Sequence, residues 1–152
     1  MNSNISITPA LVSDIPALCG LLAILFSQEA EFTPDSDAQQ RGLRLIIDNP
    51  ESGLILVARS RLNLVGMVSL LFTVSTALGN RVGLLEDMVV MPDHRKQGIG
   101  SQLLMCAIET ARQKGCKRIT LLTDHDCFSA HHFYQSHGFT KSPMIPFRIF
   151  LD

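Results

Sequence analysis

One stretch, residues 84–108, constrains the fold of this chain more than any other. Residues 84–91 are rich in apolar and β-branched side chains, which is typical of a buried strand. Pro92 ends this strand because proline has no N–H to donate to a sheet. After a short loop, residues 102–108 place apolar side chains three and four positions apart, which indicates a helix. The stretch therefore predicts a strand, a loop and a helix in direct succession.

The loop carries the residue types expected of an anion-binding site. The first N–H groups of a helix have no partner inside it and lie at the positive end of its dipole, so a phosphate binds there. Gly98 and Gly100 let a ligand approach the backbone closely, and Arg95 and Lys96 add positive charge. We predict that this loop forms a pyrophosphate cradle from the run Arg95, Lys96, Gln97, Gly98, Ile99, Gly100 and Ser101.

Two common phosphate-binding loops do not fit the cradle. A dinucleotide fingerprint requires a third Gly or Ala where Leu103 stands, and a P-loop requires a Gly-Lys-Ser/Thr triplet that the sequence lacks. The pattern Arg-x-x-Gly-x-Gly after Val-x-Pro instead resembles the acetyl-CoA-binding signature of the GNAT superfamily of N-acetyltransferases. At motif level the resemblance covers residues 84–139 and includes two further segments, Glu86-Asp87 and His132-Phe133-Tyr134 with Gly138-Phe139.

The order of predicted elements indicates one GNAT-like α/β domain, of the α+β type, over residues 1–152. Strands are predicted near residues 5–7, 54–58, 64–74, 84–91, 118–122 and 139–151, and helices near residues 13–28, 37–48, 102–114 and 129–137. The order β-α-α-β-β-β-α-β-α-β predicts a mixed central sheet of about six to seven strands with helices on both faces. The resemblance implies that the strands near 82–91 and 117–123 splay apart to admit the pantetheine arm of CoA.

Composition narrows the partners and the compartment. The net charge of −1 argues against nucleic acid as the main partner. The longest apolar run, Leu21 to Phe26, is far too short to cross a membrane, and no basic segment followed by an apolar run opens the chain. The cysteines show no C-x-x-C spacing, which is typical of a reduced chain. We therefore expect a cytoplasmic protein with free thiols at Cys19, Cys106, Cys116 and Cys127.

The resemblance implies acetyl-CoA as co-substrate and an amine acceptor, on a small molecule or a protein, that attacks directly in a ternary complex. A primary amine is mostly protonated at pH 7, and freeing it costs roughly 4–5 kcal/mol, so a base near the acceptor helps. Adjacent strand residues point to opposite faces unless a bulge intervenes, so one of Glu86 and Asp87 faces the acceptor. We favour Glu86, because in amine-acetylating members a Glu at the matching position faces the acceptor. The alternative is that both acids only bind surface cations or cap local backbone.

The resemblance assigns two further roles. Backbone N–H groups of the central strand, at Met88, Val89 and Val90, correspond to the donors that hold the thioester carbonyl as it becomes an oxyanion. Tyr134 corresponds to the general acid that returns a proton to the leaving thiolate, and the alternative is a packing tyrosine. Cys127 departs from the family pattern, which often has a cofactor-contacting Asn there. Its thiol is a weak hydrogen-bond partner, so that contact is lost or supplied by the backbone.

Several alternatives stay open. The four histidines of residues 125–137 lie near two aspartates, but none has a known metal-ligand spacing, so we expect no metal site. A non-catalytic CoA-binding sensor or interaction module would carry the same fold, and so would an acyltransferase for longer acyl chains. Acids between Glu29 and Asp37 favour a cationic acceptor. Family members often dimerise, and the apolar C-terminal strand is a candidate contributor to a homodimer.

Overall fold

The computed structural model describes residues 4–29 and 33–152. They belong to two compact units, one ending at Leu122 and the other running from Thr123 to Asp152. We refer to these as unit 1 and unit 2. Within the described residues, no helix is long and apolar enough to cross a membrane.

Unit 1 is built on one mixed sheet of five strands in the order β1-β2-β3-β4-β5. The first four strands pair antiparallel, and β5 runs parallel to β4. Parallel strands need a crossover, and here the connection between them contains α3. The strands are β1 (Ile5–Pro9), β2 (Gly53–Ser60), β3 (Asn63–Ser75), β4 (Asn80–Val90) and β5 (Ile119–Leu121).

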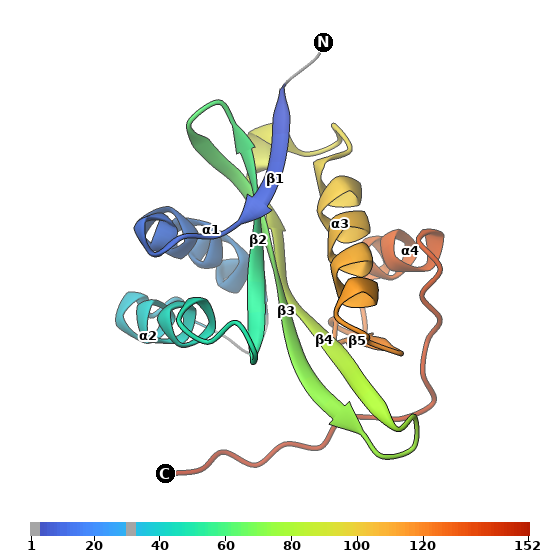
Figure 1. Ribbon diagram of the computed structural model, residues 1–152. Helices are drawn as coiled ribbons and strands as arrows, with labels where there is room; N and C mark the ends of the chain where they lie inside the picture. The colour runs from blue at the N-terminus through green and yellow to red at the C-terminus, as the bar shows by residue number, and fades with distance from the viewer. Residues whose placement is uncertain (1–3, 30–32) are drawn as a thin grey trace. The chain divides into compact units, whose positions relative to one another are not determined.

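Helices cover both faces of this sheet, as predicted. Figure 1 shows α1 (Ile15–Gln28) and α2 (Ser36–Ile47) on one face and α3 (Ile99–Gln113) on the other. Short 3-10 helices, η1 (Val12–Asp14) and η2 (Pro92–His94), precede α1 and follow β4. The core on the α1 face joins helix and strand side chains, with Leu18, Leu21, Leu43, Ile55, Val57 and Met67 among its buried members.

The opposite face of the sheet lets α3 approach closely. Leu103, Leu104 and Ala107 of α3 are fully buried. A Cβ atom placed on Gly66 of β3 would lie 3.0 Å from Leu103 Cδ1 and 3.2 Å from the carbonyl oxygen of Val89. A side chain at position 66 would therefore require Leu103 of α3 and the backbone at Val89 to shift.

Unit 2 contains one helix, α4 (Phe128–Ser136), which ends in a Schellman motif. The N–H of Gly138 donates to the carbonyl oxygen of Gln135, and the N–H of Phe139 donates to that of Tyr134, each at 3.1 Å. Gly138 has a φ of 93°, which explains the glycine at this position.

The predicted number of strands was wrong, while the fold class and the mixed sheet are confirmed. The described chain has five strands and not six to seven, because residues 139–152 form none. Pro143 and Pro146 remove two N–H donors from this segment. The rest of the segment has the apolar pattern of a strand, but it pairs with no strand in the described residues.

Candidate active site

The cradle lies where β4 leads into α3. Gly98 is the N-cap of α3 with a φ of 81°, and Lys96 also has a positive φ, of 62°. The first intrahelical bond after this turn runs from the N–H of Gln102 to the carbonyl oxygen of Gly98, at 3.0 Å. The N–H groups just before Gln102 therefore have no partner inside the helix.

The surroundings of the cradle fit an anion. Arg95, Lys96 and Gln97 are exposed, and Arg95 Nε donates to the carbonyl oxygen of Val90 at 3.0 Å, which ties the guanidinium to the end of β4. No heavy atom of the described residues lies within 4 Å of the place where a Cβ on Gly98 would stand. The backbone at Gly98 is thus open to a ligand beside two cationic side chains, an arrangement that suits an anion.

A β-bulge interrupts β4 just before the cradle. Ser69 pairs with Glu86 and Met67 pairs with Val89, so that Asp87 and Met88 together oppose the single residue between Ser69 and Met67. Asp87 has a φ of 54°, in the left-handed region that few residues other than glycine adopt. The bulge breaks the alternation of side chains that applies to an ordinary strand.

The bulge places the two neighbouring acids in different surroundings. The side chain of Glu86 is exposed, whereas Asp87 is half-buried. Burial, followed by the negative charges of Glu86 and Glu29, raises the pKa of Asp87 to about 6, and the nearby Ser69 hydroxyl opposes this rise. Ser69 is itself buried, and its Oγ has no hydrogen-bond partner of ordinary geometry among the described residues.

The last part of β4 also extends past its parallel neighbour. Pairing with β5 ends at Leu85, opposite Leu121, while β4 continues to Val90. The run from Glu86 to Val90 therefore has β3 beside it but no residue of β5 paired with it. This is the run that contains the predicted backbone donors of Met88, Val89 and Val90, of which Val89 has a buried side chain.

Tyr134 belongs to unit 2, where α4 and its Schellman motif hold it. Its ring packs against Phe133 with centroids 5.2 Å apart and against Phe139 at 5.7 Å, both edge-on. Burial, together with the charge of the Cys127 thiolate, raises the pKa of Tyr134 to about 12, so the phenol is a proton donor at neutral pH. Cys127 is the N-cap of α4, and its Sγ lies 3.8 Å from Ser129 Oγ.

The predicted site residues thus come from two places. Glu86, the three backbone donors and the cradle follow one another along β4 and into α3 of unit 1, while Tyr134 is placed by unit 2. Sequence reasoning missed Ser69, although a serine within the apolar run of β3 was a visible signal. Among the described residues, no group of three or more His, Cys, Asp or Glu side chains is arranged to hold a metal ion.

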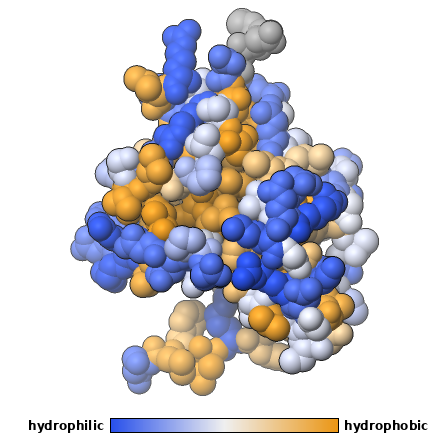
Figure 2. Space-filling view, in the orientation of Figure 1, coloured by the Kyte–Doolittle hydropathy of each residue, from blue (hydrophilic) through white to orange (hydrophobic). Residues whose placement is uncertain are grey.

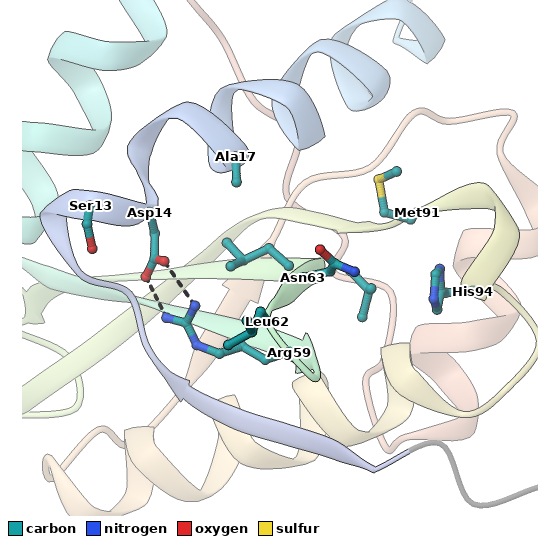
Figure 3. A pocket seen from close by; sticks show the side chains of 10 residues that line it. Ser13, Asp14, Ala17, Arg59, Leu62, Asn63, Met91 and His94 are labelled. Carbon is teal, nitrogen blue, oxygen red and sulfur yellow. Dashed lines mark hydrogen bonds and ion pairs between the residues drawn. The ribbon is translucent and has the colours of Figure 1, made fainter.

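A separate cavity of about 500 Å³ opens in unit 1 and contains none of the predicted site residues. Figure 3 shows an ion pair on its wall, in which Arg59 donates from Nη1 and Nη2 to the two carboxylate oxygens of Asp14, at 3.0 and 2.6 Å. The Arg59 guanidinium lowers the pKa of Asp14, and the Leu11 N–H, 2.8 Å from Oδ2, acts in the same direction. The polar lining also includes Ser13, Asn63 and His94.

The strand, bulge and cradle place a half-buried carboxylate, free helix N–H groups and two cationic side chains along one run of chain. The chain matches the model of the Acetyltransferase (GNAT) family over residues 21–139, and it belongs to this family of acetyl-CoA-dependent acyltransferases. The match runs across the boundary between the two units.

Individual relatives agree with this assignment. The chain is 33% identical to an uncharacterized N-acetyltransferase, YhfO, of Bacillus subtilis (strain 168), over 90% of each chain. It is 32% identical to aminoalkylphosphonate N-acetyltransferase of Salmonella typhimurium (strain LT2), over 88% of this chain and 83% of the relative. The solved structure of a putative acetyltransferase from Agrobacterium tumefaciens str. C58 superimposes with a TM-score of 0.80 at 27% identity, covering 96% of this chain and 99% of the other.

Proposed function

We propose that this chain transfers the acetyl group of acetyl-CoA directly to a primary amine, on a small molecule or a protein, and that its two units form one catalytic domain. The bulge at Asp87 is the observation that carries the proposal. It puts a half-buried carboxylate on β4, immediately before a stretch of backbone that has no β5 residue paired with it and before the cationic cradle. A base, oxyanion donors and a phosphate site thus follow one another along a single run of chain.

The carboxylate pair of β4 supplies the base. Glu86 is the member predicted from the sequence, and Asp87 is the member whose burial gives it a pKa of about 6. A base with a pKa near 6 is ionised at pH 7 yet is a stronger proton acceptor than an ordinary carboxylate. It removes a proton from the acceptor ammonium, directly or through a water, and frees the lone pair for attack on the thioester carbon.

The remaining groups act on the charges that the attack creates. The cradle binds and orients the donor through its pyrophosphate. Backbone N–H groups of Met88, Val89 and Val90 hold the oxygen that becomes negative as the amine adds. When the carbon–sulfur bond breaks, the sulfur leaves with the electron pair, and Tyr134 donates a proton to it. Because its raised pKa keeps Tyr134 protonated, the phenol is ready for this step at neutral pH.

The acceptor carries a positive charge before it reacts. The negative charges of Glu86 and Glu29 both act on Asp87, and a combined negative charge of this kind attracts an ammonium group. The Salmonella relative acts on aminoalkylphosphonates, which supports a small amine among the candidates. An acceptor panel therefore includes an aminoalkylphosphonate, diamines, free lysine and lysine-containing peptides.

Release of CoA thiol from acetyl-CoA in the presence of this panel tests the proposal. The wild type transfers to at least one amine, Tyr134→Phe lowers kcat at least tenfold without a matching change in KM for acetyl-CoA, and Glu86→Gln lowers transfer. Glu109 is an exposed acid on α3 whose carboxylate contacts only surface neighbours that the structure describes, Arg112 and Gln113, so Glu109→Gln is the matched control and keeps full activity. Binding of acetyl-CoA with no transfer to any amine would contradict the proposal and favour the sensor alternative.

A further inference from the structure

The cavity of about 500 Å³ in unit 1 has the size and the lining of a small-molecule site. Ligand pockets in proteins enclose about 300–1,000 Å³ and combine apolar walls with a few polar groups. On the face drawn in Figure 2, hydrophobic side chains gather around α1 and the β2–β3 hairpin of unit 1. The apolar part of the cavity lining consists of Ala17, Leu62, Leu64, Val65 and Met91. The polar part of the lining therefore determines which ligand the cavity takes.

Polar side chains reach the cavity from four separate segments of unit 1. Ser13 and Asp14 belong to η1, Arg59 to β2, Asn63 to the start of β3, and His94 to η2. Figure 3 shows the ion pair of Asp14 and Arg59 at one end of the lining and His94 at the other. Because these segments are far apart in the sequence, it is the fold that brings their polar groups together around one cavity.

The charges on the cavity wall cancel. Arg59 donates from Nη1 and Nη2 to the two carboxylate oxygens of Asp14, at 3.0 and 2.6 Å, and from Nε to Thr8 Oγ1 at 3.2 Å. Asp14 Oδ2 also accepts from the N–H of Leu11 at 2.8 Å. A ligand ion of either sign would meet a like charge beside the opposite one, and separating a partly buried pair is costly. An uncharged ligand avoids both costs.

Several polar groups of the lining have no partner inside the protein. Neither the Ser13 hydroxyl nor the Asn63 side-chain amide forms a hydrogen bond with another described residue. Nδ1 of His94 is buried and has no partner among the described residues either. Rotation of the His94 ring toward a ligand therefore breaks no hydrogen bond of Nδ1. These groups are available to a ligand without loss of a bond within the fold.

The available groups both donate and accept hydrogen bonds. A hydroxyl does both, and a side-chain amide offers N–H donors beside a carbonyl acceptor. Each terminal nitrogen of Arg59 also keeps a second N–H beyond the one that it donates to Asp14. An amide group matches such a wall, because it has a C=O acceptor and N–H donors and carries no charge. A ring attached to the amide would cover the apolar part of the lining.

We propose that this cavity is a second ligand site of the protein and that it takes an uncharged ring compound carrying an amide group. The amide bonds to Asn63 and Ser13, and the ring packs against the apolar lining. The proposal is independent of the acetyl-transfer chemistry, since none of the predicted site residues lines the cavity.

Benzamide, benzoate and benzamidine test the charge requirement. They have nearly the same shape, and at neutral pH they carry no charge, a negative charge and a positive charge. Titration of the full-length chain, followed by ¹H–¹⁵N nuclear magnetic resonance, measures each Kd. We expect benzamide to shift the backbone signals of Ala17, Asn63 and His94 and to bind at least about fivefold more tightly than either ion. No shift of these signals with benzamide, or an ion that binds there within about fivefold of benzamide, overturns the proposal.

Two variants test the position of the site. Ala17 is exposed in the first turn of α1, so Ala17→Phe fills the cavity without removing a buried group, and we expect it to abolish the benzamide shifts. Asn63→Ala, also at an exposed residue, should weaken binding at least about fivefold. Gln40→Phe, at an exposed residue of α2 outside the cavity, is the matched control and binds benzamide as the wild type does. Wild-type binding by either cavity variant overturns the proposal.

Acetyl-CoA distinguishes this site from the cradle, which His94 directly precedes in the sequence. We expect benzamide to bind with the same Kd when the protein is saturated with acetyl-CoA. Displacement of benzamide by acetyl-CoA would place benzamide in the acyl-donor site and overturn a separate site. If the protein binds no acetyl-CoA, the proposed function fails, whereas the benzamide titration alone still decides this proposal.

Discussion

The bulge in β4 and the cradle before α3 share a feature of backbone conformation, but their side chains carry opposite charges. Each places a residue other than glycine in the left-handed region, Asp87 in the bulge and Lys96 in the cradle. The cradle is exposed and cationic, with backbone donors free. The bulge is half-buried and anionic, and its charge is opposed by burial and by two neighbouring acids. A solvated charge costs little stability, whereas a buried and uncompensated one costs a great deal.

This difference predicts that changes in the cradle and changes in the bulge affect the stability of the protein differently. Changes in the cradle should weaken binding of acetyl-CoA, and they should lower stability only where they alter the backbone conformation. Changes in the bulge should alter stability and activity in opposite directions, as at sites where function requires an unfavourable arrangement.

Asp14 differs from Asp87 because its negative charge is paired with a cationic side chain. We expect Asp14→Ala to lower the free energy of unfolding by about 3 kcal/mol, since it leaves the guanidinium of Arg59 without its carboxylate. Urea denaturation measures the loss. Asp48→Ala is the control, because Asp48 pairs with Arg44 at an exposed site, and it should cost less than about 0.5 kcal/mol.

The pH dependence of the Asp14 contribution also has a definite sign. The folded-state pKa of Asp14 is lowered, so its stabilisation is present above the unfolded-state pKa and is lost as pH falls through the folded-state value. An Asp14→Ala penalty that stays constant down to pH 2 would contradict the ion-pair explanation.

Asp87 should show the opposite pH dependence. Its folded-state pKa of about 6 lies above the unfolded value, so the folded state binds more protons, and wild-type stability falls as pH rises from about 4 to 7. We expect Asp87→Asn to raise the free energy of unfolding at pH 8 by on the order of 2 kcal/mol, and to be near neutral at pH 4. Denaturation at both pH values checks this, and equal effects at the two would contradict a buried, raised carboxyl.

A substitution at the glycine of the cradle should act through the backbone conformation. Gly98→Ala places a Cβ on a residue with a φ of 81°, which costs about 1–2 kcal/mol of stability and weakens binding of acetyl-CoA. Gly42→Ala, in α2 with open space around it, should instead stabilise by about 0.5–1 kcal/mol. Calorimetric titration with acetyl-CoA and thermal unfolding measure the two effects. Unchanged binding in Gly98→Ala would contradict a cradle at this position.

The smallest effect is expected at Ser69. Ser69→Ala removes a buried hydroxyl that makes no hydrogen bond of ordinary geometry among the described residues, and it should change stability by no more than about 1 kcal/mol. Because that hydroxyl lowers the Asp87 pKa, the variant should raise this pKa slightly. A nuclear magnetic resonance titration of the Asp87 carboxyl carbon measures the shift, and a shift downward would contradict the arrangement.

The left-handed turn at the start of the cradle helix could be predicted from the sequence, because glycine is the residue that most readily adopts a positive φ. Gly98 is at a left-handed N-cap, and Pro92 follows the end of the buried strand. The β2–β3 hairpin and the helices on both faces were predicted from apolar periodicity, which depends on neighbours close in sequence.

The bulge and the strand count could not be predicted in this way. An aspartate does not mark a left-handed residue, so the position of the bulge was visible only through the pairing of Ser69 with Glu86 and of Met67 with Val89. Residues 147–151 have the composition of a strand, but a strand also needs a partner edge, and no local pattern shows whether one is within reach. Burial of Asp87 depends on the same long-range pairing.

The pH dependence of kcat/KM for the best acceptor tests most directly whether the bulge supplies the base. The wild type should gain activity through a limb near pH 6, the pKa of Asp87. Asp87→Asn should lose this limb and at least about a hundredfold in kcat/KM while binding acetyl-CoA normally, and Glu86→Gln should keep the limb. An Asp87→Asn enzyme that retains both the limb and its activity would contradict a base in the bulge.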